Sequence, residues 1–149
     1  MRLYTLLKAI IQRGLPVTGT FTPMIMNRQG SNPAVDDASG YTRSLRGVYT
    51  RVGNIVFFKI SLYNFSITSN PGTLGSVGGL PFKAAADGVV NIVSTLNWGF
   101  SVAGEDVTFD LTAGESKLWL RNKATTNSAS WQTSPRIFLD VVGSYIAEL

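Results

Sequence analysis

Apolar and polar residues alternate along the middle of this 149-residue chain, most regularly between residues 55 and 63. This alternation predicts a β-strand, because successive side chains of a strand point to opposite faces of the sheet. One face carries Val56, Phe58, Ile60 and Leu62, and the other carries Ile55, Phe57, Lys59, Ser61 and Tyr63. The second face holds large apolar residues that one sandwich core cannot cover, which indicates contact with another chain.

The residues before this strand predict a hairpin. Gly53-Asn54 is a two-residue turn with glycine first, which is the pattern of a type II′ turn. Residues 47–52 then form the partner strand. On that strand, Arg51 is expected either to pair with a carboxylate or to cross the contact between two subunits.

Five further segments have strand-like patterns between turn residues: 21–26, 88–98, 107–111, 118–120 and 137–149. Residues 27–46, 69–79 and 125–134 are expected to be connections, the second with room for one short strand. Gly143 is expected to mark a bulge or bend. The sequence shows no second helix and no internal repeat. The predicted fold is therefore all-β, a jelly-roll-like β-sandwich of about eight strands.

An amphipathic helix is predicted at residues 2–13. Its apolar stripe has helical spacing and consists of Leu3, Leu6, Leu7, Ile10 and Ile11. Gly14 ends the helix, and Pro16 follows. A helix this short is marginal alone in water, so the stripe must pack on the chain's own β-domain or on other chains. We expect contact with other chains, with residues 1–14 as a docking or oligomerisation helix and 15–149 as the β-sandwich domain.

The composition supports assembly and excludes several kinds of chemistry. Charged residues make up only 15% of the chain, against about 25% in typical soluble domains, so an oligomer is expected. The chain contains no cysteine and no histidine, which removes disulfides, thiolate nucleophiles and the commonest general base and metal ligand. The net charge of +4 is scattered without a basic run, so no nucleic-acid partner is expected.

Other segments argue against a membrane and a metal. The longest apolar-rich stretch, residues 3–11, is far too short to span a bilayer and lacks a signal-peptide cleavage pattern, so synthesis in a cytoplasm is expected. The acidic pairs 36–37 and 105–106 lack the spacing of a calcium loop. Residues 72–79 are rich in glycine but lack the lysine of a phosphate-binding loop. We expect no cofactor and no metal.

Four short motifs occur here in the order and spacing found in a known family. They are Gly19-Thr-Phe-Thr-Pro23, Gly47-Val-Tyr-Thr-Arg51 with Gly53-Asn54, Gly78-Gly-Leu-Pro-Phe82, and Val142-Gly-Ser-Tyr-Ile146. Over residues 19–149 the chain resembles the jelly-roll-like domains of bacteriophage tail fibres and virion surfaces. Relatives often carry tryptophan where this chain has Phe21. The motif residues have scaffold roles in turns and in the core.

The resemblance implies a homotrimer on the outside of a phage particle, made in the bacterial cytoplasm and located in the virion. Because the chain has no fibrous shaft, it is expected to be mounted directly on a baseplate, fibre or capsid. The expected role is that of a non-enzymatic tail-fibre or baseplate subunit that recognises the host surface, with a host-surface glycan as one candidate partner. The alternatives are a capsid decoration (cement) protein and, less favoured, a polysaccharide depolymerase, for which no cleft pattern is visible.

Two sets of residues are candidates for these contacts, and no catalytic residues are expected. The oligomer or docking set is Leu3, Leu6, Leu7, Ile10, Ile11, Arg51, Phe57 and Trp119. The receptor-contact set is Trp131, Asn127, Gln132, Asp36 and Asp37, in the loops 27–46 and 123–134. In so polar a loop Trp131 is either a lid on the core, the favoured interpretation, or an exposed contact.

Overall fold

The computed structural model describes residues 2–96, 107–122, 125 and 127–148, without the side chains of residues 11, 12 and 91–96. One helix and ten strands follow one another along the described residues. They are α1 (Arg2–Gln12), β1 (Val17–Phe21), β2 (Met24–Gln29), β3 (Ala34–Asp37), β4 (Ser44–Val52), β5 (Ile55–Ser69), β6 (Thr73–Gly78), β7 (Val89–Leu96), β8 (Val107–Leu111), β9 (Leu118–Asn122) and β10 (Ser134–Ile146).

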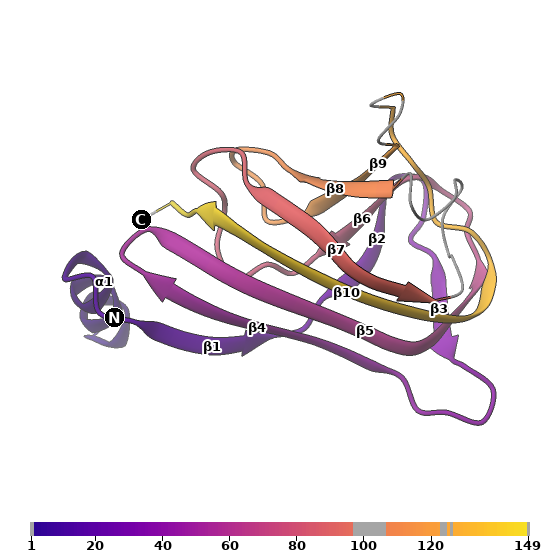
Figure 1. Cartoon of the computed structure of the whole chain (residues 1–149), viewed down its shortest axis with the longest axis horizontal. Helices are drawn as coiled ribbons and strands as arrows, with labels where there is room; N and C mark the ends of the chain where they lie inside the picture. Colours follow the sequence, from indigo (N-terminus) through magenta and orange to yellow (C-terminus); the bar gives the residue numbers. More distant parts are fainter. Residues whose placement is uncertain (1, 97–106, 123–124, 126, 149) are drawn as a thin grey trace.

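The strands form two antiparallel sheets packed as a sandwich (Figure 1). Sheet A has the order β1-β4-β5-β10-β7, with β3 also paired to β5, and sheet B has the order β2-β6-β9-β8. The helix lies beyond the end of the sandwich where the β4–β5 turn is found, which we call the helix end. We call the opposite end, with β3, the distal end. The predicted all-β sandwich with a short N-terminal helix is confirmed.

The long strand β5 has the two faces that its alternation predicts. Val56, Phe58, Ile60 and Leu62 are buried in the core, whereas Ile55 and Phe57 are exposed on the outer face of sheet A. The alternation changes at Asn64, whose φ of 57° is in the left-handed region. Beyond that residue three successive side chains are buried: Phe65, Ser66 and Ile67.

The hairpin between β4 and β5 has the predicted turn. Val52 pairs with Ile55, which leaves Gly53 and Asn54 as the two turn residues. Gly53 has a φ of 61°, and Asn54 is not among the described residues with positive φ. A positive φ at the first turn residue alone agrees with a type II′ turn, which suits the twist of the two strands.

Two of the recurrent motifs are explained by reciprocal contacts between glycine and aromatic residues across β1 and β4. Gly19 pairs with Tyr49, and Phe21 pairs with Gly47. A Cβ on Gly19 would lie 2.6 Å from the Tyr49 ring, and one on Gly47 would lie 2.3 Å from the Phe21 ring. Each ring therefore covers the glycine opposite it, as aromatic residues do when they protect glycines in designed sheets.

Residues 21–26 form two strands, so the prediction of one strand is wrong. β1 ends at Phe21 in sheet A, and β2 begins at Met24 in sheet B. Pro23, between them, is buried and has no N–H group for either ladder. The chain therefore crosses from one sheet to the other at this proline.

The two longest predicted connections also contain strands. Residues 27–46 include β3 and the start of β4, and residues 69–79 include β6. β6 lies inside sheet B between β2 and β9. Gly75 of β6 allows close packing in the core, because a Cβ at this position would lie 2.5 Å from Leu120 and 2.9 Å from Trp131.

The last strand runs from Ser134 to Ile146, so the single last strand that the sequence predicts is confirmed with different ends. The register irregularities of β10 lie between Ser134 and Phe138 and at Asp140–Val141, not at Gly143. Gly143 instead allows close packing, because a Cβ there would lie 2.6 Å from the ring of Phe58. Residues 97 and 98 of the predicted strand 88–98 lie outside the described residues.

The helix α1 ends where the sequence predicts. Gly14 has a φ of 70°, and the N–H of Leu15 donates a hydrogen bond of 3.3 Å to the carbonyl of Ile10. This bond and the left-handed glycine match a Schellman cap, which satisfies a carbonyl in the last turn of a helix.

Candidate functional site

The outer face of sheet A carries a continuous group of exposed apolar side chains near the helix end. We call these five residues the apolar patch: Val52, Ile55, Phe57, Val89 and Ile146. Their exposed fractions run from 38% for Val52 to 65% for Val89. Cross-strand pairs connect them, since Ile55 lies opposite both Val52 and Ile146. Ser144 joins the remaining two, lying opposite Phe57 on β5 and Val89 on β7.

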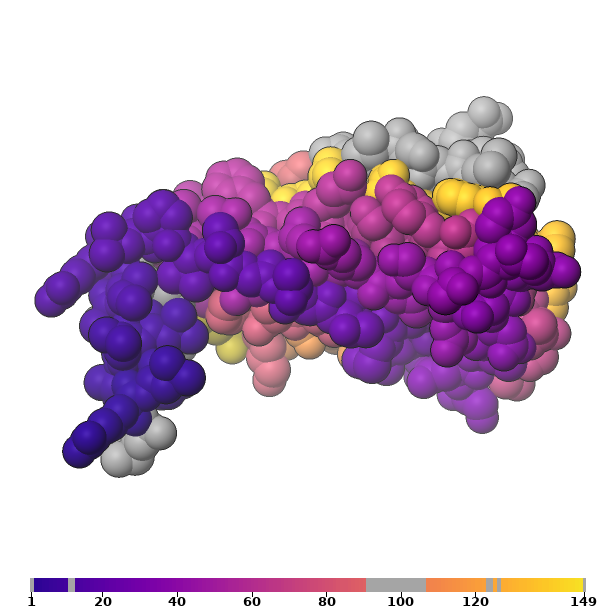
Figure 2. Space-filling model, turned by 90° about the horizontal axis from the view of Figure 1, so that it is seen from below, coloured from indigo at the N-terminus to yellow at the C-terminus, as the bar shows by residue number. Residues whose placement is uncertain are grey.

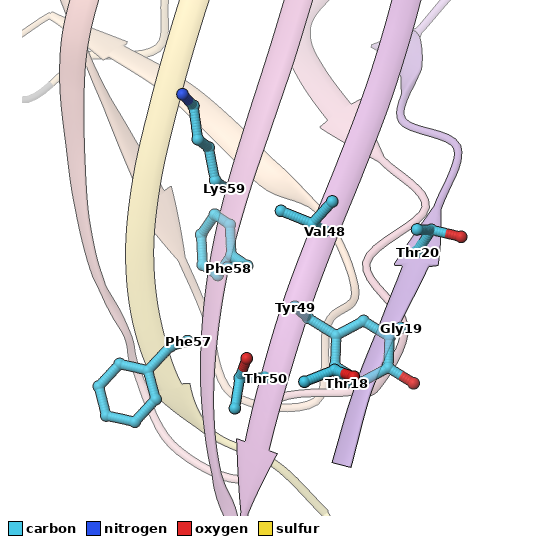
Figure 3. A pocket seen from close by; sticks show the side chains of 9 residues that line it. All are labelled: Thr18, Gly19, Thr20, Val48, Tyr49, Thr50, Phe57, Phe58 and Lys59. Atoms are coloured by element: carbon cyan, nitrogen blue, oxygen red, sulfur yellow. The ribbon is translucent and has the colours of Figure 1, made fainter. Parts of the chain in front are cut away.

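A shallow depression of about 480 Å³ continues the apolar patch toward β1. Figure 3 shows its lining, with the hydroxyl groups of Thr18, Thr20 and Thr50 beside Val48 and Phe57. The described lining is of mixed character, since three threonine hydroxyl groups and the Lys59 ammonium group lie among apolar and aromatic side chains.

A polar cluster follows the apolar patch along the same face. The Oδ1 atom of Asp140 accepts hydrogen bonds from the hydroxyl groups of Ser61, at 2.8 Å, and Tyr63, at 2.6 Å. The ammonium group of Lys59 lies 3.8 Å from the same oxygen. Asp140 lies on β10, and the two hydroxyl groups that it bonds lie on the neighbouring strand β5. These hydrogen bonds therefore hold the two strands in register.

Toward the distal end, this face carries a stack of aromatic rings and one guanidinium group. The Arg136 guanidinium lies 3.6 Å from the ring centre of Tyr41 and 4.6 Å from that of Phe138. The ring of Phe138 lies 5.6 Å from that of Tyr63. Arg136 also donates two hydrogen bonds to Oδ1 of Asn64. The stack ties the loop after β3 to β10 through cation–π contacts.

The helix presents part of its apolar stripe to solvent. Leu3 is 78% exposed and Leu6 is 58% exposed, whereas Leu7 and Ile10 are half-buried. The side chain of Ile11 lies outside the described residues. Figure 2 shows the indigo N-terminal segment standing out from the end of the sandwich. One side of the helix thus faces its own chain, and the other side is available to a partner.

Arg51 is not a surface contact, so its predicted place in a contact between two subunits is wrong. Its side chain is buried, and the residue is only 2% exposed. Its Nε–H donates to the carbonyl of Gly53 at 2.9 Å, and its Nη2 donates to the carbonyl of Glu148 at 3.1 Å. Within the described part of the chain no carboxylate lies within ion-pair distance. The guanidinium therefore braces the β4–β5 turn against the C-terminal segment, and burial lowers its pKa.

The two tryptophans predicted at contacts are both covered by their own chain. Trp131 is 1% exposed, and its indole N–H lies 3.1 Å from the carbonyl of Met26 and 3.3 Å from that of Ser76. It is therefore a core residue, as the favoured interpretation has it, and not a receptor contact. Trp119 is also buried, beneath the cationic groups of Arg28 and Lys117. The prediction that Trp119 lies in a contact between subunits is therefore wrong.

The remaining predicted receptor residues are exposed, but they are not all together. Asp36 and Asp37 lie on β3 at the distal end, where Asp37 pairs with Arg43 at 3.6 Å. Gln132 lies beside Thr133, which shares a shallow depression with Asp37. Asn127 lies apart from these residues. Its backbone carbonyl accepts a hydrogen bond from the N–H of Asn122 on β9. The structure therefore brings Asp37 and the region of Gln132 together and leaves Asn127 with sheet B.

Sequence reasoning missed three of the five residues of the apolar patch. Val52, Val89 and Ile146 each end or begin a strand, where alternation gives a weak signal. Their common face becomes visible only from the register of β5, β7 and β10. Ile146 ends the motif at residues 142–146, but nothing in that motif alone places it opposite Ile55.

No group of three or more acidic side chains gathers in the described part of the chain. Of the helices described, none is long and apolar enough to cross a bilayer.

Comparisons with known proteins bear on the fold. No family model and no curated protein matches the chain. The structure is similar to the crystal structure of the Dettilon tailspike protein (gp208), with a TM-score of 0.66 and 15% sequence identity. The match covers 95% of this chain and 26% of the tailspike, so the chain spans about a quarter of that protein. The β-sandwich described here therefore has the fold of part of a phage tailspike.

Proposed function

We propose that this protein is a non-enzymatic structural subunit of a bacteriophage tail fibre or baseplate, and that it forms a homotrimer through the apolar patch. The apolar patch is the observation that carries the proposal. Monomeric proteins rarely leave a continuous apolar surface in water, and such surfaces mark contacts with other chains. The tailspike-like fold supports a tail location, and the number of three subunits rests on the resemblance of the sequence motifs.

The helix supports a second contact, with another virion protein. Residues 2–13 contain Arg2, Lys8 and Arg13 and no acidic residue. Identical basic helices repel one another, whereas an acidic and partly apolar surface attracts them. We therefore propose that Leu3 and Leu6 dock on such a surface of the baseplate, fibre or capsid.

The distal end is the proposed host-recognition surface. It lies at the end of the long strands opposite the helix, so it points away when the helix is docked (Figure 1). It combines the carboxylates of Asp36 and Asp37 with the exposed ring of Tyr41. Aromatic faces beside polar groups suit a host-surface glycan.

The arrangement of the carboxylates supports a non-enzymatic role. A glycan-cleaving enzyme needs two carboxylates that face each other across a cleft. In this protein Asp110 pairs with Arg121 at 3.0 Å, and Asp87 accepts a hydrogen bond from the backbone of Ala113. These two, like Asp140, are held by their own chain.

Two measurements test the proposal. Purified protein should compete with phage particles for adsorption to susceptible cells, and the virion should hold few copies, at the tail. Failure to bind any susceptible cell would remove the recognition role. Hundreds of copies on the shell would instead establish the capsid decoration protein, and release of reducing sugar from host polysaccharide would establish the depolymerase.

A further inference from the structure

A cavity of about 220 Å³ lies at the helix end, between α1 and the sandwich. We propose that this cavity binds a carboxylate group carried on a small apolar body. Its walls come from three segments: Tyr4, Leu7 and Lys8 of α1, Arg51 of β4, and the neighbouring Phe82 and Lys83. The proposal goes beyond the trimer and the host-recognition surface, because it uses neither the apolar patch nor the distal end.

Arg51 is the main reason for expecting an anion. It is a cation buried under the helix, and its two described hydrogen bonds go to neutral backbone carbonyls. Among the described residues its Nη1 makes no hydrogen bond, and no carboxylate lies within ion-pair distance. A buried charge is costly when it has no opposite charge, so an anion that reaches Nη1 would be bound favourably.

The charges around the cavity favour a single negative charge. Lys8, Arg51 and Lys83 supply three cationic groups, and Glu148 supplies the one acidic side chain in the lining. A guanidinium group offers parallel N–H donors that match the two oxygens of a carboxylate. The lysines are exposed and flexible, so they add attraction without fixing the geometry.

The walls favour an apolar body attached to that charge. The Phe82 ring lies 4.4 Å from the Arg51 guanidinium, and Tyr49 packs edge-on against the same ring at 5.3 Å. Leu7 and Tyr4 close the cavity from the helix. The volume is below the roughly 300 Å³ of the smallest common ligand sites, so the ligand must be small. An aromatic or short alkyl carboxylate meets these conditions better than free phosphate, which has no apolar part.

Occupancy would affect the helix as well as the cavity. The ligand would contact α1 on one side and Arg51 and Phe82 on the other. A ligand held by both parts stabilises the arrangement in which they are together. We therefore expect binding to slow hydrogen exchange at the backbone amides of α1.

Titration of the full-length protein with benzoate tests the proposal, with benzamide as the neutral control of the same shape. Benzoate should shift the NMR signal of the Arg51 Nε–H group with a dissociation constant of about 1 mM, typical of so small a ligand. It should also slow exchange in α1. Benzamide and inorganic phosphate should do neither. Equal effects of benzoate and benzamide, or no shift at Arg51, would overturn the proposal.

Charge variants separate the cavity from general attraction. Lys83→Gln should weaken benzoate binding about two- to fivefold, as expected for one exposed charge. Arg46→Gln removes an equal charge from an exposed position on β4 and should leave the affinity unchanged. Arg51→Gln should abolish the interaction, provided that circular dichroism shows a folded protein. Equal affinities for Lys83→Gln and Arg46→Gln would contradict the site even if Arg51→Gln does not fold.

The source of the carboxylate is a separate outcome of the same titration. A short peptide that ends in phenylalanine, compared with its C-terminal amide, tests whether a protein chain end can enter. Binding of the free-acid peptide alone would indicate a partner's chain end, and binding of benzoate without the peptide would indicate a small free acid. Failure of both would overturn the proposal without affecting the proposed trimer.

Discussion

The side chain of Tyr145 is buried in the core, and its strand β10 pairs with β5, where Tyr145 lies opposite Val56. Its hydroxyl group donates a hydrogen bond of 3.0 Å to the carbonyl of Phe82, and its ring packs against that of Phe58. Burial raises the pKa of Tyr145 to about 12, although the Arg51 charge acts in the other direction. The neutral hydroxyl is therefore the form that the folded protein stabilises.

This raised pKa predicts a loss of stability in alkali. The unfolded tyrosine releases its proton near pH 10, whereas the folded one holds it to about pH 12, so the stabilisation is complete below pH 10 and disappears as the pH rises to 12. Tyr145→Phe should cost about 1 kcal/mol at neutral pH, for the lost hydrogen bond. The difference between the two proteins should shrink above pH 10 in urea unfolding. A constant difference from pH 8 to 12 would show that Tyr145 does not titrate this way.

Gly47 provides a second test at the scale of single residues. A Cβ at this position would meet the Phe21 ring at 2.3 Å, so Gly47→Ala should displace the ring and destabilise the protein by about 1–3 kcal/mol. Thr50→Ala, on the outer face of the same strand, should stay within about 0.5 kcal/mol. Thermal unfolding followed by circular dichroism compares the two. Similar melting temperatures would mean that the packing of the Phe21 ring does not require a glycine at position 47.

The limits of sequence reasoning differ from residue to residue. The two faces of β5 were predictable, because alternation is a property of neighbouring residues. The environment of Arg51 was not, because its acceptor at Glu148 is 97 positions away. For Trp131 the sequence predicted only that the side chain is either a lid on the core or an exposed contact. Its burial depends on the close approach of Gly75 from another strand.

At the scale of elements, the helix was predictable and several strands were not. A stripe at helical spacing, followed by glycine, specifies α1 locally. β6 was predicted only as room for one short strand within a connection, because glycine and serine usually mark a connection, whereas here Gly75 makes room for Leu120 and Trp131. The break between β1 and β2 depends on which sheet each strand joins, and alternation carries no information about that.

Deletion of residues 1–14 tests the role of α1. The sandwich should remain folded, because β1 begins at Val17 and the described core residues all come after that position. Attachment to the particle should be lost, since Leu3 and Leu6 are then absent. Circular dichroism and incorporation into virions measure the two effects. A deletion that unfolds the sandwich would show that the helix is an integral part of the domain.

At the scale of the whole molecule, the low content of charged residues predicted an oligomer but could not locate the contact surface. The apolar patch draws its members from the hairpin strands β4 and β5 and from β7 and β10, which come much later in the sequence. Phe57 and Ile55 were predicted to need cover, and the register adds the three neighbours that make the surface continuous. The assembly of this surface with copies of itself is the central claim.

The mass of the protein in solution tests that claim most directly. Sedimentation of the wild-type protein at micromolar concentration should give three times the 16.1 kDa mass of the chain. Phe57→Lys places a charge in the centre of the apolar patch and should give a folded monomer, whereas Thr112→Lys, at an exposed position outside the patch, should remain a trimer. A wild-type monomer, or a Phe57→Lys trimer with unchanged stability, would contradict assembly through this face.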